Sequence, residues 1–173
     1  MFSDKKILVA YFSKAGQNYL KGEITDLEKG NTEVVAEKIA EITGADIFKI
    51  DPVKEYPEDY NACVKVASDE WTTGARPEIK GDKDISGYDA IVLGYPNWMG
   101  TMPMAVWTFL EGRDFSGKTV IPFCTNEGSG MGRSEKDLEK LVPGADVKNG
   151  YAIRGASVGK VGFDLENWLG ELL

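Results

Sequence analysis

Long apolar runs, each followed by polar residues and glycine, recur along this chain. Three such runs cover residues 7–12, 91–95 and 119–124. Runs that lack polar alternation are typical of strands buried on both faces, as in parallel sheets covered by helices. We predict further strands over residues 46–50 and 146–153, the second of them interrupted by Gly150.

Between these strands, apolar residues recur at the spacing of an α-helix. The first helix is expected to begin at Asn31 or Thr32, either of which can cap its N-terminus, and to end at Gly44 in the left-handed conformation. A second helix is expected to open at Pro57. The remaining helices are predicted over residues 102–110, 134–141 and 163–172.

The same spacing predicts which helical side chains are buried. Trp107 is expected to lie in the core, and Trp168 is expected to dock the last helix. Phe163 falls on the apolar face of that last helix. The second helix should bury one face, which carries Tyr60, Cys63, Val64, Ala67 and Trp71.

Strands and helices alternate along the whole chain. This order predicts an α/β fold, with a doubly wound, five-stranded parallel sheet covered by helices on both faces through right-handed crossovers. No linker, repeat or low-complexity segment divides the 173 residues, so a single domain over residues 1–173 is expected.

Three of the predicted strands end in loops rich in hydroxyls, amides and glycine. In open α/β sheets, ligands bind beyond the carboxyl ends of the strands, so these loops are expected to meet at one site. Their hydroxyl and backbone N–H donors suit a phosphate, and Trp98 is the best candidate to stack on a planar ring. The predicted phosphate loop comprises Ser13, Lys14, Ala15, Gly16, Asn31 and Thr32; the predicted ring walls are Pro96, Asn97, Trp98, Met99 and Gly100 on one side and Thr125, Asn126, Glu127 and Gly128 on the other.

Composition narrows the chemistry of such a site. The chain has no histidine, which excludes Ser-His-Asp and Cys-His mechanisms and argues against a zinc site. A formal net charge of −8 disfavours binding to nucleic acid or to anionic membrane surfaces. No apolar stretch is long enough to span a bilayer and no signal peptide is visible, so a cytoplasmic protein is expected.

In the three loops that follow the predicted strands, the chain resembles flavodoxin-like proteins, in particular a bacterial group of short flavodoxin-fold proteins with a YP-x-W-x-G loop. The resemblance rests on Val-Ala-Tyr-Phe-Ser13, Gly30-Asn-Thr32, Tyr95-Pro-Asn-Trp-Met-Gly100, and Ile121-Pro-Phe-Cys-Thr125 with its Gly-Ser-Gly130. It implies the strand order 2-1-3-4-5 and a flavin mononucleotide (FMN) bound between the first and third strands.

Residues 17–30 interrupt the usual flavodoxin phosphate loop and separate Gly16 from Asn31. They could form a flap over the phosphate or an excursion that leaves the two halves of the loop in place. We favour the excursion, because longer loops add little closure entropy. Either Gly16 or Gly30 could then fill the glycine position of the family.

The resulting hypothesis is an FMN-binding flavoprotein that passes electrons to a redox partner protein or reduces a small planar, quinone-like acceptor. Glu127 is expected to be a solvated turn residue rather than a catalytic acid, and Cys124 a small buried packing residue. The alternative is a doubly wound domain without flavin, either phosphatase-like or an interaction module. A tyrosine phosphatase, however, needs a Cys-x5-Arg loop, and the chain has Gly130 where that arginine would stand.

Overall fold

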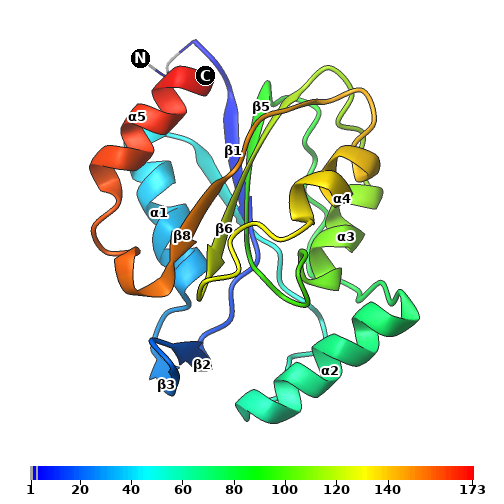
Figure 1. Ribbon diagram of the computed structural model, residues 1–173. Coiled ribbons are helices and arrows are strands. Elements are labelled where there is room, and N and C mark those ends of the chain that lie inside the picture. The colour runs from blue at the N-terminus through cyan, green and yellow to red at the C-terminus, as the bar shows by residue number, and fades with distance from the viewer. Residues whose placement is uncertain (1, 3) are drawn as a thin grey trace.

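The central sheet of this computed structural model, which describes residue 2 and residues 4–173, is parallel throughout (Figure 1). Its strands follow the order β4-β1-β5-β6, with β7 and β8 both pairing with β6. The predicted order 2-1-3-4-5 is therefore confirmed. The strands are β1 (Ile7–Tyr11), β4 (Asp46–Lys49), β5 (Ala90–Pro96), β6 (Thr119–Asn126), β7 (Asp146–Val147) and β8 (Tyr151–Arg154).

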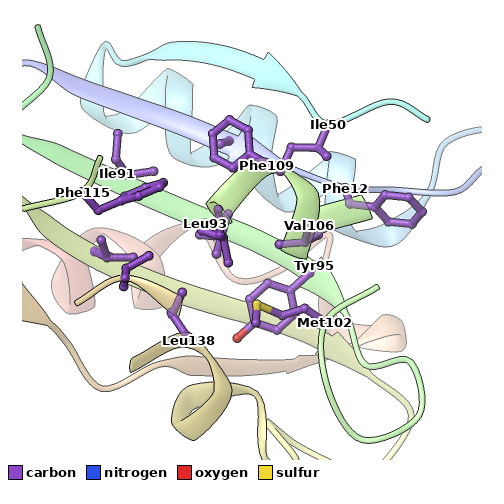
Figure 2. Packing of buried hydrophobic residues seen from close by; sticks show 14 of the residues in the cluster. Phe12, Ile50, Ile91, Leu93, Tyr95, Met102, Val106, Phe109, Phe115 and Leu138 are labelled. Carbon is purple, nitrogen blue, oxygen red and sulfur yellow. The ribbon is translucent and has the colours of Figure 1, made fainter. Parts of the chain in front are cut away.

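Helices cover both faces of the sheet, as the unbroken apolar strands require (Figure 1). One face packs against α1 (Asn31–Thr43) and α5 (Gly162–Leu172), and the other against α3 (Met104–Glu111) and α4 (Ser134–Leu141). Successive residues of β1 alternate between the two cores: Leu8 belongs to the α3/α4 side and Val9 to the α1/α5 side. Figure 2 shows the α3/α4 core, in which Phe12, Leu93, Tyr95 and Phe109 are fully or almost fully buried.

The last predicted strand is divided in two around Gly150, at the point that the sequence indicated. β7 pairs with Thr119 and Val120, and β8 pairs with residues 123–126 of β6. Between them the chain leaves the ladder, and the N–H of Gly150 donates to the carboxylate of Glu135 at 2.8 Å. A side chain at Gly150 would require the flexible end of Met131 to move and would approach the Pro122 carbonyl to 3.1 Å.

The prediction for the second helix needs two corrections. α2 (Tyr60–Thr73) begins at Tyr60 rather than at Pro57, because the carboxylate of Asp59 caps it by accepting the N–H of Ala62 at 2.9 Å. The helix projects from the body of the molecule (Figure 1), and its buried residues are Cys63 and Ala67. Val64 and Trp71, both expected on the buried face, are 36% and 44% exposed.

Of the other aromatic residues predicted to be buried, Trp107 and Trp168 are packed as expected and Phe163 is not. Trp107 is partly buried against the α3/α4 core, and its indole N–H donates to the Met102 carbonyl at 3.2 Å. Trp168 docks α5 as expected, with its ring 5.2 Å from that of Tyr151. Phe163, in contrast, is 75% exposed, because it lies in the first turn of α5 on the side away from the sheet.

Residues 16–27 form a two-stranded antiparallel hairpin of β2 (Gly16–Leu20) and β3 (Glu23–Leu27). The hairpin lies at the same end of the molecule as the arrowhead of β6 and the start of α1 (Figure 1). A short 3-10 helix, η1 (Gly155–Ser157), follows β8 at this end. Within the described residues, the structure has no helix with the length and apolar character needed to cross a membrane.

Candidate functional site

A cavity of about 200 Å³ opens at the carboxyl ends of β1, β5 and β6, beside the first turn of α1. The structure therefore brings together the three loops that the sequence singled out. Ten predicted residues line the cavity: Ser13, Lys14, Asn31, Thr32, Pro96, Asn97, Trp98, Thr125, Asn126 and Glu127. Five predicted residues lie outside the lining, namely Ala15, Gly16, Met99, Gly100 and Gly128. Four residues that the sequence analysis did not assign to the site belong to the lining, namely Asn18, Tyr19, Tyr60 and Ser129.

Ser13 connects the first loop to the start of α1. Its hydroxyl accepts the backbone N–H of Glu33 at 3.1 Å, across twenty positions of sequence. The capping residue is Gly30, so the prediction that Asn31 or Thr32 caps this helix is wrong. A side chain at Gly30 would collide with the Ser13 hydroxyl and come within 2.7 Å of the Lys14 carbonyl. Gly30 is thus the glycine that lets the helix start approach the first loop.

Two hydroxyls meet on the floor of the cavity. The Oγ1 atoms of Thr32 and Thr125 lie 2.7 Å apart, and the two residues are only 2% and 4% exposed. Thr32 stands in the first turn of α1 and Thr125 near the end of β6. The first N–H groups of a helix have no intrahelical acceptor, so this floor combines hydroxyls with the positive end of a helix dipole.

The loop after β5 forms a tight turn that presents Trp98 to the cavity. Trp98 and Thr101 exchange two backbone hydrogen bonds, of 2.9 and 3.1 Å. The residues between them, Met99 and Gly100, have φ of 56° and 79°. This is the geometry of a two-residue turn of the type that hairpins prefer. It places Met99 and Gly100 at the tip of the turn, which explains why they do not line the cavity.

Asn97 ties this turn to the loop after β6. Its side-chain carbonyl accepts the N–H of Gly100 at 3.1 Å, and its amide donates to the Gly130 carbonyl at 3.0 Å. Its own N–H donates to the Thr125 carbonyl at 2.9 Å. Two of the three predicted loops are therefore joined through one side chain.

Other aromatic rings hold Trp98 in place. Phe12 and Tyr56 each meet it edge-on, with ring centroids 5.0 Å apart. Tyr56 is fixed in turn by its hydroxyl, which donates to the Glu70 carboxylate at 2.6 Å. Burial raises the pKa of Glu70 above its ordinary value, and the hydrogen bond from Tyr56 opposes that shift. Trp98 is therefore a rigid wall rather than a mobile surface side chain.

The β2–β3 hairpin is a wall of the cavity as well as an excursion from the loop. The two halves of the loop stay in place, as expected, since Ser13 and Lys14 line the cavity together with Asn31 and Thr32. Asn18 and Tyr19 of β2 line the cavity, and the Tyr19 ring stacks on Tyr60 at a centroid distance of 6.1 Å. The side-chain carbonyl of Gln17 accepts the N–H of Tyr60 at 2.9 Å. A signal for this hairpin was present in the sequence: a Lys-Gly pair separates two short segments that mix polar and apolar residues.

Glu127 is exposed, as expected of a turn residue, but its side chain also makes a hydrogen bond to the hairpin. Its carboxylate accepts the backbone N–H of Lys21, at the tip of the hairpin, over 2.9 Å. The two residues are 106 positions apart in the sequence. This bond links the loop after β6 to the tip of the hairpin.

Cys124 lies beneath the site as a packing residue, as the sequence analysis favoured. The residue is fully buried, burial raises the pKa of its thiol to about 12, and the thiol donates to the Thr125 carbonyl at 3.6 Å. Arg133 points elsewhere: its guanidinium lies 5.0 Å from the Trp71 ring and donates to the Met99 carbonyl at 3.1 Å. A phosphatase-like pairing of thiolate and arginine is therefore not formed here.

The sequence model of the flavodoxin family matches residues 6–172. This chain belongs to the flavodoxin family. No curated protein matches this flavodoxin-family chain at a significant level.

Several solved structures resemble this member of the family. A presumed flavoprotein from Bacteroides eggerthii is 32% identical, with a TM-score of 0.74 and coverage of 97% of this chain and 98% of that one. A presumed flavoprotein from Bacteroides uniformis is 30% identical, with a TM-score of 0.75 and coverage of 96% and 98%. A flavoprotein from Lactobacillus acidophilus, in complex with FMN, shares the fold at 24% identity, with a TM-score of 0.64 and coverage of 90% and 97%.

Proposed function

We propose that this flavodoxin-family protein binds FMN in the cavity and transfers electrons through it to a redox partner. The observation that carries the proposal is the convergence of the hydroxyl floor, the start of α1 and Trp98 on one cavity. The structure of the Lactobacillus acidophilus flavoprotein with FMN supports the choice of flavin.

The donors at one end of the cavity fit a phosphate group. Ser13, Asn31 and Thr32 line it beside the N-terminus of the 13-residue helix α1, whose dipole favours an anion there. The Lys14 ammonium is held at the same end by the carbonyls of Ala15 and Gln17, at 3.3 and 3.2 Å. Hydroxyls, helix dipole and ammonium together match the charge and the acceptor oxygens of a phosphomonoester.

The other end fits a planar ring with a polar edge. Trp98 supplies an aromatic surface, and Pro96 and Asn97 continue the wall of the cavity. Thr125, Asn126, Glu127 and Ser129 supply polar groups on the opposite side. An apolar wall with a few placed polar groups is the usual lining of a cofactor site.

Electron transfer to a partner is the function that membership of the flavodoxin family favours. Bound flavin supplies reversible one- and two-electron chemistry, and the protein supplies binding and electrostatics. The cavity is open to solvent beyond the carboxyl ends of the strands, so an edge of the bound flavin would be within reach of a partner.

A binding experiment tests the cofactor. The purified protein is titrated with FMN and with riboflavin, which lacks the phosphate, and FMN should bind at least about tenfold tighter because of its charge-assisted contacts. Lys14→Ala should reduce this preference, whereas Lys140→Ala, an exposed lysine of α4, should not. Equal affinity for the two flavins would refute the phosphate end, and no flavin binding would refute the proposal.

A kinetic experiment tests carrier against reductase. The reduced protein is mixed with increasing concentrations of a benzoquinone, and the rate of flavin oxidation is followed in a stopped-flow instrument. The rate should rise linearly, because no second planar molecule is bound before the transfer. Saturation at low quinone concentration would show a substrate site and would favour a reductase.

A further inference from the structure

The β2–β3 hairpin is fastened to three separate elements around the cavity. At its base, Gln17 accepts the first N–H of α2, that of Tyr60, at 2.9 Å. At its tip, the N–H of Lys21 donates to Glu127 in the loop after β6, also at 2.9 Å. Between these points, the side chain of Leu20 reaches Gly155 of η1. A hairpin anchored at base, middle and tip is a fixed wall of the site.

The hairpin covers the end of the cavity that carries the predicted phosphate donors. The amide of Asn18 donates to the carbonyls of Lys14 and Gly16, at 2.9 and 3.1 Å. In return the Lys14 ammonium donates to the Gln17 carbonyl at 3.2 Å. The bonds between Lys14 and residues 17 and 18 join the first half of β2 to the loop after β1.

The space beyond this end is filled. A β-carbon placed on Gly155 would lie 2.5 Å from the amide nitrogen of Asn31 and 2.6 Å from a methyl of Leu20. Asn31 begins α1, Leu20 ends β2 and Gly155 begins η1, so three elements meet here in close contact. A ligand that continued past its phosphate would have to separate them.

We infer that the β2–β3 hairpin makes this site selective for a flavin that ends in a phosphomonoester over one extended by a second phosphate and a nucleoside. The inference rests on the proposed function, since it assumes that the phosphate lies at the Ser13 end. The hairpin closes the route that the extension of flavin adenine dinucleotide (FAD) would need. The bond from Lys21 to Glu127 is the latch that holds the hairpin in this position.

A shortened hairpin tests the inference directly. Gln17 and Asp26 are cross-strand partners, so residues 18–25 can be replaced by Asn-Gly, which favours a tight two-residue turn. This variant keeps the Gln17 contact with α2 and loses Asn18, Tyr19, Leu20 and the latch. FMN, riboflavin and FAD are titrated into the wild-type protein and the variant, and circular dichroism checks the fold.

In the wild-type protein, FMN should bind at least about tenfold tighter than FAD, and the shortened hairpin should reduce that ratio by about tenfold. An unchanged ratio in a folded variant would overturn the inference. Equal binding of FMN and FAD by the wild-type protein would also overturn it, while leaving the proposed FMN site standing. If the wild-type protein binds no flavin, the proposed function fails and the inference fails with it.

Point variants test the latch if the shortened hairpin does not fold. Glu127→Ala removes the acceptor for Lys21, whereas Glu127→Gln keeps an oxygen in its place. Release of FMN should be about fivefold faster in Glu127→Ala, and Glu127→Gln should recover most of the slow release. Glu139→Ala, an exposed carboxylate of α4, is the control for loss of charge. Equal release rates in Glu127→Ala and the wild-type protein would refute the latch.

Discussion

The hydroxyls of Thr32 and Thr125 lie 2.7 Å apart, although 93 positions of sequence separate the two residues. Both residues are buried, and they join the first turn of α1 to the end of β6. One hydroxyl donates to the other, and the O–H of the acceptor is left to donate into the cavity. The floor of the proposed site is thus also a link between the two halves of the fold.

Removing one hydroxyl of the Thr32–Thr125 pair should lower the free energy of unfolding, because it leaves the other hydroxyl without its hydrogen-bond partner. Thr125→Val leaves the Thr32 hydroxyl buried without its partner, and we expect a loss of about 1–2 kcal/mol in the free energy of unfolding. Thr32→Val should behave alike, and the double variant should lose much less than the sum of the two. Urea unfolding of the four proteins measures this, and fully additive losses would show that the two hydroxyls do not interact.

The parallel sheet and the place of the site could be predicted because both depend on local patterns, whereas the strand order followed only from the resemblance to flavodoxin-like proteins. The runs at 7–12, 91–95 and 119–124 lack polar alternation, so they had to be buried on both faces. The carboxyl ends of neighbouring parallel strands share an edge of the sheet, which brings Ser13, Trp98 and Thr125 to one cavity. Gly150 similarly marked the break between β7 and β8.

The cap of α1, the exposure of Trp71 and the place of the hairpin depend on contacts between residues far apart in the sequence. The spacing of apolar residues along the chain does not reveal such contacts. The cap of α1 was misplaced because its acceptor, Ser13, belongs to another loop. Trp71 has helical spacing with buried residues, but α2 packs along a narrow stripe and leaves the ring 44% exposed. The hairpin was assigned outside the site because its bond to Glu127 crosses 106 positions.

Trp98 and Trp168 should separate flavin binding from stability. Trp98→Ala removes the aromatic wall of the cavity and should weaken FMN binding by about tenfold or more, with a stability loss of about 1 kcal/mol from its edge-on contacts. Trp168→Ala should lower the free energy of unfolding by about 2–3 kcal/mol, because it opens the packing of α5 against Tyr151. It should leave FMN affinity unchanged.

Paired melting curves and FMN titrations on both variants check this assignment. Trp98→Phe should restore part of the lost affinity, because it keeps an aromatic face. If Trp168→Ala lost the flavin and Trp98→Ala only lost stability, the roles of wall and core would be reversed.

The buried thiol of Cys124 should make the protein sensitive to alkali. In the folded state the pKa of the thiol is raised from its ordinary 9.0 to about 12, so the native protein keeps a proton that the unfolded chain releases. This contribution to stability is therefore complete below pH 9 and is lost as the pH rises from 9 to 12. The loss should be about 1.4 kcal/mol per pH unit within that window.

Unfolding by urea at pH 8 and pH 10, on the wild-type protein and Cys124→Ala, isolates this thiol. Other alkaline groups, including Cys63, whose pKa burial also raises, titrate in both proteins and cancel in the difference. The wild-type protein should lose about 1 kcal/mol more than the variant over this interval. Parallel losses would mean that Cys124 ionises as easily in the folded state as in the unfolded chain.

Substituting Asn97 should weaken FMN binding with only a small effect on the stability of the fold. Its side chain holds the N–H of Gly100 on one side and the carbonyl of Gly130 on the other, so it fixes the turn that presents Trp98. Asn97→Ala frees both groups, and we expect FMN binding to weaken by about tenfold, with a stability loss of about 1 kcal/mol. Asn61→Ala, an exposed asparagine of α2, should change neither quantity.

Asn97→Asp separates the two bonds of this side chain. The aspartate keeps the acceptor for Gly100, loses the donor to Gly130, and brings a negative charge to the wall of the cavity. Stability should fall at least as far as in Asn97→Ala, because a carboxylate oxygen would face the Gly130 carbonyl with no proton between them. The reduction potential of the bound flavin should become more negative, because the charge disfavours an added electron. Spectroelectrochemical titration of the FMN-loaded variant measures that potential. A potential equal to that of the wild-type protein would place Asn97 away from the flavin ring and would confine its role to holding the turn.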